Sequence, residues 1–337
     1  MQRAPRTRLR RFARVGSWLF LALVGWLLVR YARGVDWAAV AEALRGYGPA
    51  HLALALALSL LSYATYACYD LAARRYAGHA LDTRRVLPIA ATCYAFALGL
   101  GALIGGAGLR LRMYARAGLP VSCIVRVVAF SVATNWVGYV ALAGVLFATG
   151  TVATPVAWGL GGGLLRGLGV AMLLLAIACL AACVRWRGRT FHFRGHHFRL
   201  PSPGLALVQM ALAAGNWSLM GTLVWVLLDG AVGWPLVVAT LLLSAVAAAL
   251  VHMPAGLGVI EAVFVAVLGP AGLALATEPA LLAALLAYRA VYYLLPLLLA
   301  AIFYLVFEAR ATGRRAGSDR RRASPGNARG GRQGARR

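Results

Sequence analysis

The sequence contains no lysine, and only nine acidic residues stand against 34 arginines. It has no Asp-x-Asp pair and no P-loop motif, and none of its five cysteines forms a Cys-x-x-Cys pair. Enzymes that use acid–base or metal chemistry usually bring carboxylates or metal ligands together, so we expect no catalytic residues, no metal site and no cofactor. Without a P-loop, we also expect that this chain does not use ATP directly.

Apolar residues dominate the composition instead. They make up 62% of the 337 residues, and several apolar runs reach the roughly 20 residues that cross a ~30 Å hydrocarbon layer. The sequence therefore predicts an all-α, polytopic membrane protein. The net charge of +25 comes from arginines that cluster at the ends of apolar runs, where they encode topology. We expect membrane phospholipids, chiefly anionic ones, as partners, and no nucleic acid.

Arginine distribution predicts the orientation of the chain. Six arginines precede residue 15, four lie in the 73–86 loop, five in the 185–200 loop and ten beyond 308. The positive-inside rule makes these segments, and both termini, cytoplasmic. The expected spans between them are 15–31, 50–72, 121–149, 156–184, 203–229 and 280–308.

These boundaries divide the chain into three parts. Residues 1–14 form a basic cytoplasmic N-terminus, and residues 15–308 form the membrane domain. Residues 309–337 are rich in Gly and Arg and poor in apolar side chains, so we expect a disordered cytoplasmic tail.

Two further apolar regions, 86–118 and 233–269, must each begin and end on one side of the membrane if the arginine-rich loops are all cytoplasmic. The first contains LGALIGGAGLRLRMYARAG and the second VHMPAGLGVIEAVFVAVLG. Each therefore has an apolar segment that enters the membrane, a glycine-rich break and a short helix. We interpret both as re-entrant hairpins. Because 86–104 and 233–252 are long enough to cross, the spanning alternative stays open.

The two regions enter from opposite faces, and each is flanked by a span on either side. The fold predicted from this plan is a transmembrane helix bundle with two inverted repeats, about 50–149 and about 203–308, and two re-entrant broken-helix units. Inverted repeats with broken helices are typical of transporters whose binding site lies near the bilayer midplane.

The glycine breaks are the first candidate substrate-binding elements. Backbone that is not helical at membrane depth needs protein or a water-filled cavity around it, and a helix N-terminus that follows favours an anion such as phosphate. Alternatively, the glycines serve only close helix packing. The residues concerned are Gly105, Gly106 and Gly108 in the first break, and Pro254, Gly256 and Gly258 in the second.

Glu261 and Arg289 form the second candidate site. Glu261 lies in the first turn after the second break, and Arg289 lies roughly 13 Å into its span at 1.5 Å per residue. We expect the two side chains to converge, with Arg289 available to a lipid phosphate; the alternative is a structural ion pair. Tyr292 and Tyr293 follow one helical turn later, and Pro296 frees the carbonyl of Tyr292.

Arg112 and Arg116 share one face of the short helix after the first break, whereas Arg110 points elsewhere. They suit an anionic headgroup that arrives from the cytoplasmic side, or they are ordinary interfacial charges. Asp70, Asn135 and Asn216 are either pathway residues or interhelical hydrogen-bonding or interface groups.

Three segments together resemble a known family. HMPAGLGVIEAVFVAVLG, LLAALLAYRAVYYLLPLLLA and GGAGLRLRMYARAGLP are similar to segments of YbhN-like bacterial inner-membrane proteins, whose superfamily includes the transmembrane flippase domain of lysylphosphatidylglycerol synthase. The resemblance implies a lipid-handling domain in the bacterial inner membrane, with Gly256, Gly258, Glu261 and Arg289 at family-pattern positions. The chain is too short to add the soluble aminoacyl-transferase domain, so we expect it not to make lysyl-lipid.

The function that follows is a carrier or flippase that moves an anionic phospholipid or a lipid-linked precursor between leaflets. Two alternatives stay open: a membrane enzyme acting on a lipid-linked substrate, and a non-transporting accessory subunit of an envelope complex. The sequence also leaves a homo-oligomer open.

Overall fold

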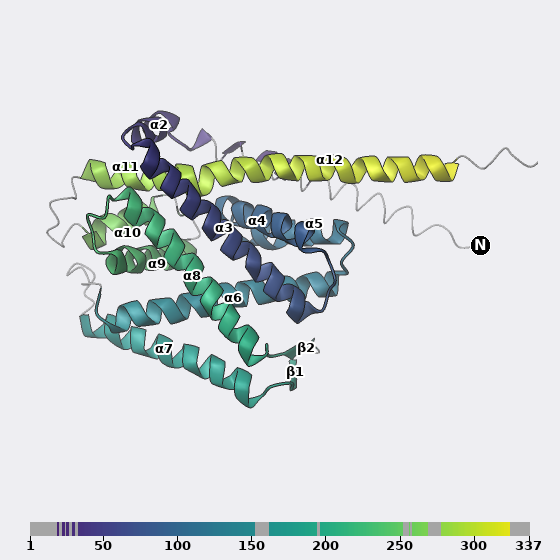
Figure 1. The fold of residues 1–337 in the computed structure, drawn as a ribbon, viewed down its shortest axis with the longest axis horizontal. Coiled ribbons are helices and arrows are strands. Elements are labelled where there is room, and N and C mark those ends of the chain that lie inside the picture. The colour runs from purple at the N-terminus through teal and green to yellow at the C-terminus, as the bar shows by residue number, and fades with distance from the viewer. Residues whose placement is uncertain are drawn as a thin grey trace, which may run out of the picture.

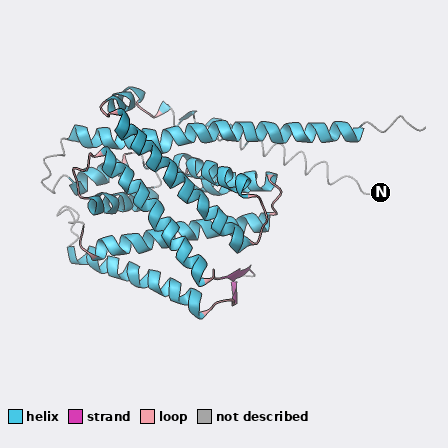
Figure 2. Ribbon diagram, viewed as in Figure 1, coloured by secondary structure: helices cyan, strands magenta, loops and turns pink. Residues whose placement is uncertain are grey.

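The computed structural model describes residues 33–151, 162–193, 196–251, 256, 258–268 and 278–323, together with several positions between 19 and 30. These residues form helices and one two-stranded antiparallel hairpin (Figures 1 and 2). In chain order the elements are α2 (Trp37–Arg45), α3 (Pro49–Ala77), α4 (Thr83–Leu100), the π-helix η1 (Ala102–Gly108), α5 (Leu109–Arg116), α6 (Val121–Ala148), α7 (Gly162–Arg185), β1 (Thr190–Phe193), β2 (His196–Arg199), α8 (Pro203–Leu227), α9 (Trp234–Val251), α10 (Val259–Leu268), α11 (Glu278–Arg289), the π-helix η5 (Ala290–Leu294) and α12 (Leu295–Ala323).

Within the described residues, six helical segments are long and apolar enough to cross a bilayer. They are Pro49–Ala77, Val121–Ala148, Gly163–Arg185, Pro203–Leu227, Trp234–Val251 and Ala280–Ala309. The prediction of an all-α membrane bundle is confirmed, and five of these segments coincide with expected spans. The expected span 15–31 falls mostly outside the described residues. Helix α12 continues to Ala323, past the boundary drawn at 308.

Local sequence accounts for the ends of the two central helices. Pro49 opens α3, where its missing N–H is not needed, and Gly78 ends it in the left-handed conformation at φ 71°. Ser202 caps α8 by accepting a hydrogen bond from the N–H of Leu205. Arg74 and Arg75 in the last turn of α3 complement the helix dipole.

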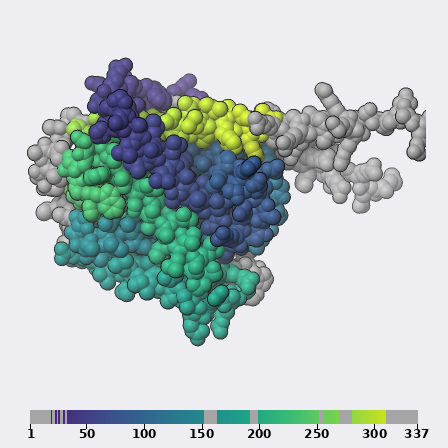
Figure 3. Space-filling view, viewed as in Figure 1, coloured from purple at the N-terminus to yellow at the C-terminus, as the bar shows by residue number. Residues whose placement is uncertain are grey.

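Helices α3 and α8 pack against each other and run in opposite directions. The Tyr47 hydroxyl, just before α3, donates to the carbonyl of Leu227 at the end of α8, and the Tyr76 hydroxyl near the end of α3 donates to the carbonyl of Arg199 just before α8. In the space-filling view, α3 lies as a purple seam between the green surface of α8 and the blue surface of α4 (Figure 3). This pair joins the first half of the chain to the second.

The other helices pack on this pair or on its neighbours. Helix α6 packs on α3, α7 and α8, while α12 packs on α4, and α9 packs on both α8 and α10. Figure 1 shows α12 along one side of the bundle and α7 along the opposite side. Leu164, Leu168, Leu174, Leu175 and Ile177 of α7 are exposed, as expected for a helix that faces lipid.

The first glycine segment differs from the expectation. The backbone turns at Gly101, at φ 90°, and residues 102–108 form a π-helix that leads directly into α5, so the predicted break at Gly105, Gly106 and Gly108 is wrong. A Cβ on Gly105 would lie 1.9 Å from the carbonyl oxygen of Phe96. Close packing of η1 on α4 therefore requires this glycine.

The second break is present where the sequence predicts it. Gly256 and Gly258 adopt φ values of 60° and 77°, and α10 begins at Val259. These left-handed conformations favour glycine because other residues pay a steric cost there. Pro254 lies outside the described residues.

We expect Gly138→Ala to destabilise the protein. A Cβ on Gly138 of α6 would lie 2.1 Å from the Cβ of Ala213 on α8, so the two helices must separate, at a cost of about 1–3 kcal/mol. Thermal unfolding in detergent measures the effect. Gly215→Ala on α8 is the matched control, because no atom lies within 4 Å of its added methyl group. Equal melting temperatures for the two variants would contradict the close helix contact.

Candidate functional site

Arg289, the last residue of α11, and Glu261, in the first turn of α10, converge as the sequence predicts. Arg289 Nε donates to Glu261 Oε1 at 2.6 Å, and Nη2 donates to Oε2 at 2.8 Å and to the carbonyl oxygen of Gly256 at 3.0 Å. The side chains are 7% and 19% exposed, respectively. One guanidinium group thus binds both the carboxylate and the backbone of the second break. This bidentate arrangement fixes the orientation of α10 relative to α11.

Gly256 occupies a restricted place in this break. Its left-handed backbone disfavours other residues, and an added Cβ would lie 3.1 Å from Cγ1 of Ile260 and 3.2 Å from Cβ of Ala248. A side chain would therefore push the Gly256 carbonyl away from Arg289. The glycine at position 256 therefore allows its carbonyl to lie within hydrogen-bonding distance of Arg289.

The π-helix η5 begins immediately after Arg289 and exposes two backbone carbonyls to α3. Val291 O accepts a hydrogen bond from Ser59 Oγ at 3.2 Å, and Tyr292 O accepts one from the Tyr63 hydroxyl at 3.1 Å. Pro296 has no N–H to offer to the preceding turn, so a neighbouring helix supplies the donor. The carbonyl predicted to be free is used to attach η5 to α3.

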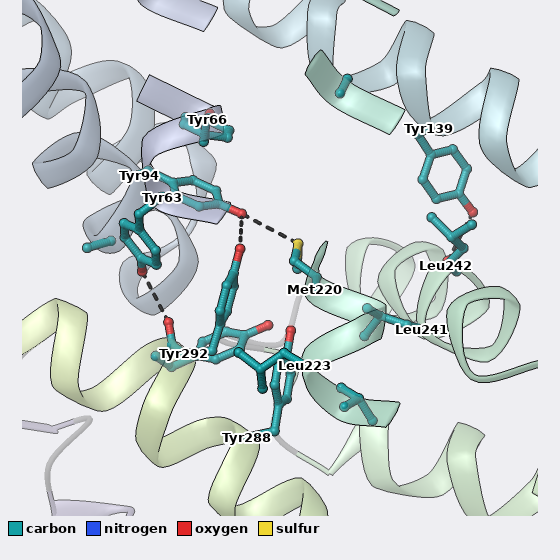
Figure 4. Close-up of a cluster of buried hydrophobic side chains, with 14 of the residues drawn as sticks. Tyr63, Tyr66, Tyr94, Tyr139, Met220, Leu223, Leu241, Leu242, Tyr288 and Tyr292 are labelled. Carbon is teal, nitrogen blue, oxygen red and sulfur yellow. Dashed lines mark hydrogen bonds between the residues drawn. The ribbon is translucent and has the colours of Figure 1, made fainter. Parts of the chain in front are cut away.

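A hydroxyl network joins α3, α4, α8 and η5 at the centre of the bundle. The Tyr292 hydroxyl lies 2.7 Å from Ser62 Oγ and 2.8 Å from the Tyr94 hydroxyl. Ser62 donates to Asn216 Oδ1 at 2.7 Å, and Asn216 Nδ2 donates to Tyr94 at 3.4 Å. Figure 4 shows the Tyr94 and Tyr292 hydroxyls directed at each other, with Met220 beside them. Asn216 is thus an interhelical hydrogen-bonding group.

A second buried ion pair lies in the first half of the chain. Arg110 Nε and Nη2 contact the two carboxylate oxygens of Asp70 at 3.2 and 3.3 Å. The hydroxyls of Tyr114 and Ser131 also donate to Asp70, at 2.7 and 2.6 Å. Asp70 is fully buried, and these donors satisfy both of its oxygens. Sequence reasoning missed the pair, although an acid and an arginine within apolar segments were a signal.

Tyr66 connects this pair to the hydroxyl network. Its hydroxyl lies 3.5 Å from Arg110 Nη2, and its ring stacks on that of Tyr94 with centroids 3.6 Å apart. Tyr94 in turn reaches Tyr292, three residues after Arg289. A chain of aromatic side chains, Tyr66, Tyr94 and Tyr292, therefore connects Arg110 to η5, which begins directly after Arg289.

Arg112 and Arg116 of α5 form a third cluster with Glu308 of α12. An Nη2 atom of each arginine lies 2.6 Å from Glu308 Oε1, and the three side chains are between 12% and 16% exposed. The two arginines share a face, as predicted, while Arg110 turns inward to Asp70. Glu308 was not singled out from the sequence, although it is an acidic residue at the end of an apolar span.

The candidate residues thus fall into distinct groups. Gly256, Glu261 and Arg289 form one cluster, and Tyr292 and Tyr293 are buried directly after it in η5. Arg112 and Arg116 form the cluster with Glu308, whereas Gly105 and Gly106 of η1 belong to the contact with α4.

We expect Asp70→Asn to lower the free energy of unfolding by about 3–5 kcal/mol, because Arg110 would remain buried without its counter-charge. Removal of both charges in Asp70→Asn/Arg110→Met should cost less than the sum of the two single changes. Chemical unfolding in detergent gives the coupling energy. Glu42→Gln, an exposed position on α2, is the control. Additive effects of the two single changes would mean that the pair contributes no coupling.

Comparison with known proteins identifies the family. The family model described as the lysylphosphatidylglycerol synthase TM region matches residues 15–300. The chain is 43% identical over 312 residues to the inner membrane protein YbhN of Escherichia coli (strain K12), which covers 93% of this chain and 96% of YbhN. It is 28% identical over 302 residues to the uncharacterized protein slr0712 of Synechocystis sp., over 88% and 91% of the respective chains. The resemblance noted in the glycine motifs is confirmed: this multi-pass membrane protein belongs to the lysylphosphatidylglycerol synthase TM region family.

Proposed function

We propose that the protein is a carrier or flippase that moves a lipid with an anionic headgroup, either a phospholipid or a lipid-linked precursor, between the leaflets of the bacterial inner membrane. The single observation that carries the proposal is Arg289, a buried cation bound to a break in a membrane helix. The family is named for a synthase of an anionic-lipid derivative, and the similar YbhN is an inner membrane protein. The family name supports a lipid substrate, and the name of YbhN supports this location.

We also propose that the two halves of the membrane domain are inverted repeats. In this interpretation α3, α4, η1–α5 and α6 correspond to α8, α9, α10 and α11–α12. The packing supports it, because α3 contacts α4 as α8 contacts α9, and α6 contacts α9 as α12 contacts α4. The antiparallel course of α3 and α8 supports opposite orientations for the two halves.

The units α4–η1–α5 and α9–α10 are then the re-entrant elements. Helix α5 has eight residues and α10 has ten, and at 1.5 Å per residue each covers about half of the hydrocarbon layer or less. Each short helix carries a charged residue in a buried ion pair, Arg110 in α5 and Glu261 in α10. In both units the charged residue lies in the first turn of the short helix, which supports a common role, although its partner lies on α3 in the first unit and on α11 in the second.

The arginine-rich end of the bundle faces the cytoplasm in this proposal. Arg74 and Arg75 end α3, Arg84 and Arg85 begin α4, and Arg185 ends α7. The bond between Tyr76 and Arg199 attaches the start of α8 to the same end. This distribution supports an inside-positive topology with the C-terminus in the cytoplasm.

Arg289 acts by ligand exchange. Phosphate and carboxylate oxygens both accept paired hydrogen bonds from a guanidinium group, so a lipid phosphate competes with Glu261 for Arg289. Glu261 neutralises the arginine whenever no lipid is bound, which avoids an unpaired charge at membrane depth. The headgroup passes along the second break while the acyl chains remain in the bilayer.

We expect Arg289→Ala to reduce lipid translocation to about one tenth of the wild-type rate or less, because charge-assisted hydrogen bonds of about 1.5–3 kcal/mol are lost. The assay is leaflet exchange of fluorescent phosphatidylglycerol and phosphatidylcholine in proteoliposomes, followed by protection from an impermeant quencher. Arg126→Ala, an exposed arginine of α6, is the matched control and should keep the wild-type rate.

A second variant separates function from folding. Glu261→Gln/Arg289→Gln removes both charges, so no unpaired ion remains, and we expect a folded protein that does not move lipid. If folded Arg289→Ala or the double variant translocated lipid at the wild-type rate, the proposed role of Arg289 would be wrong.

A further inference from the structure

A cavity of about 500 Å³ lies where the last turn of α3 meets the first turn of α8. Figure 1 shows these two helix ends beside the β1–β2 hairpin. The Tyr76 hydroxyl near the end of α3 donates to the carbonyl of Arg199, just before α8, at 2.7 Å, and this bond joins the two sides of the cavity. Small-molecule sites commonly have volumes of ~300–1,000 Å³, so the cavity is large enough for a ligand.

Two arginines, and no acidic residue, are among the described residues that line this cavity. Arg75 and Arg199 are both exposed, and within the described chain neither forms an ion pair. Arg199 Nη2 donates to the carbonyl of Gly188 at 3.4 Å. The neighbouring hairpin segment 192–198 contains no acidic residue in its sequence. The cavity therefore carries positive charge that an anion can neutralise.

Both helices that border the cavity are apolar enough to cross a bilayer. The apolar segment Pro49–Ala77 ends at the cavity, and the segment Pro203–Leu227 begins there. Local structure fixes both helix ends, because Gly78 ends α3 in the left-handed conformation and Ser202 caps α8. The cavity thus lies at the level at which two crossing segments leave the hydrocarbon layer, which is the level of lipid phosphates.

The rest of the lining suits an amphiphile. Leu205 and Val208 of α8 also line the cavity, and they lie three residues apart, on one face of the helix. Val208 is 44% exposed, so this apolar face is open to the surroundings of the bundle. A phosphate group beside the arginines would leave acyl chains next to apolar side chains of α8. Free phosphate would use only the charged part of the lining.

We propose that this cavity binds the headgroup of an anionic phospholipid from the adjacent leaflet, with Arg75 of α3 and Arg199 before α8 as its cationic ligands. The bound headgroup bridges the first half of the chain to the second at the arginine-rich end of the bundle. The site shares no residue with the cluster of Gly256, Glu261 and Arg289. The inference takes its lipid class from the proposed function, yet binding at this site requires no transport.

The charge of the cavity makes the site selective. Phosphatidylglycerol brings one net negative charge, whereas phosphatidylcholine adds an ammonium group that the two arginines repel. Arginine also binds phosphate oxygens through paired hydrogen bonds. Anionic lipid is therefore the preferred ligand.

Gly204 offers a test that separates charge from size. It lines the cavity in the first turn of α8, and no atom lies within 4 Å of a Cβ added there. Gly204→Glu introduces a carboxylate among the lining residues without a clash at Cβ, at a helix N-terminus that favours acidic side chains. Gly204→Gln adds a side chain of the same length without the charge. A difference in lipid binding between these two variants therefore reports the charge alone.

Binding to the purified full-length chain in detergent is measured by isothermal titration calorimetry with dihexanoyl-phosphatidylglycerol, dihexanoyl-phosphatidylcholine and inorganic phosphate. We expect Gly204→Glu and Arg75→Gln each to weaken phosphatidylglycerol binding about tenfold, because each change removes positive charge from the cavity. Gly204→Gln should stay close to wild type. Arg126→Gln, an exposed arginine of α6 that does not line the cavity, is the matched control for Arg75→Gln and should also match wild type.

Equal affinity for phosphatidylglycerol in Gly204→Glu and Gly204→Gln, or in Arg75→Gln and Arg126→Gln, would overturn the site, even if the wild type exchanges lipid between leaflets. Both positions are exposed, so the two tests remain independent if one variant does not fold. Phosphatidylcholine binding as tightly as phosphatidylglycerol would overturn the selectivity for anionic lipid. Inorganic phosphate binding as tightly would overturn the lipid as ligand. Charge-dependent lipid binding in a protein that moves no lipid would uphold the site while the proposed function fails.

Discussion

A charged side chain within the bilayer must be paired, and this constraint organises the membrane domain. Asp70 holds Arg110, Glu261 holds Arg289, and Glu308 holds two arginines of α5. Each contact joins a short helix to a longer one, because α5 and α10 each supply one side of the pair. The chain has only nine acidic residues, and three of them form ion pairs with arginines of the membrane domain.

Backbone carbonyls that leave the regular helical pattern inside the membrane domain also need hydrogen-bond partners. A π-helix replaces α-helix at η1 and η5, and in η5 the released carbonyls accept hydrogen bonds from Ser59 and Tyr63 of α3. In the second break the carbonyl of Gly256 accepts from Arg289. Side-chain donors thus satisfy backbone groups that water cannot reach, and η5 remains attached to α3 although its helical pattern changes.

The sequence predicted features that depend on local pattern. Hydropathy located five of the six apolar segments. The position of Arg289 along its span correctly predicted that its side chain meets Glu261. Pro296 correctly indicated that the Tyr292 carbonyl needs another donor, which proved to be Tyr63. These predictions succeeded because helix rise and proline geometry are fixed regardless of the surrounding fold.

Contacts that depend on helix rotation and crossing were not predictable. Arg112 and Glu308 are 196 residues apart in sequence, so their meeting depends on how α12 crosses the first half of the bundle. The glycines of η1 looked like a break, yet Gly105 is required by a contact with the backbone of α4. A glycine motif alone does not distinguish a turn from a close approach, since both need a residue without a Cβ.

The carboxylate–arginine clusters of the short helices are consistent with the proposed carrier. An arginine that had no internal partner would either be excluded from the membrane or bind its lipid too tightly to release it. An internal carboxylate lowers the net gain from binding phosphate, because one paired state replaces another of similar geometry. The free-energy difference between the loaded and the empty states is then small, so in the proposed function the lipid is released as well as bound. Glu261 suits the proposed exchange, because its carboxylate and the carbonyl of Gly256 bind the same guanidinium group of Arg289.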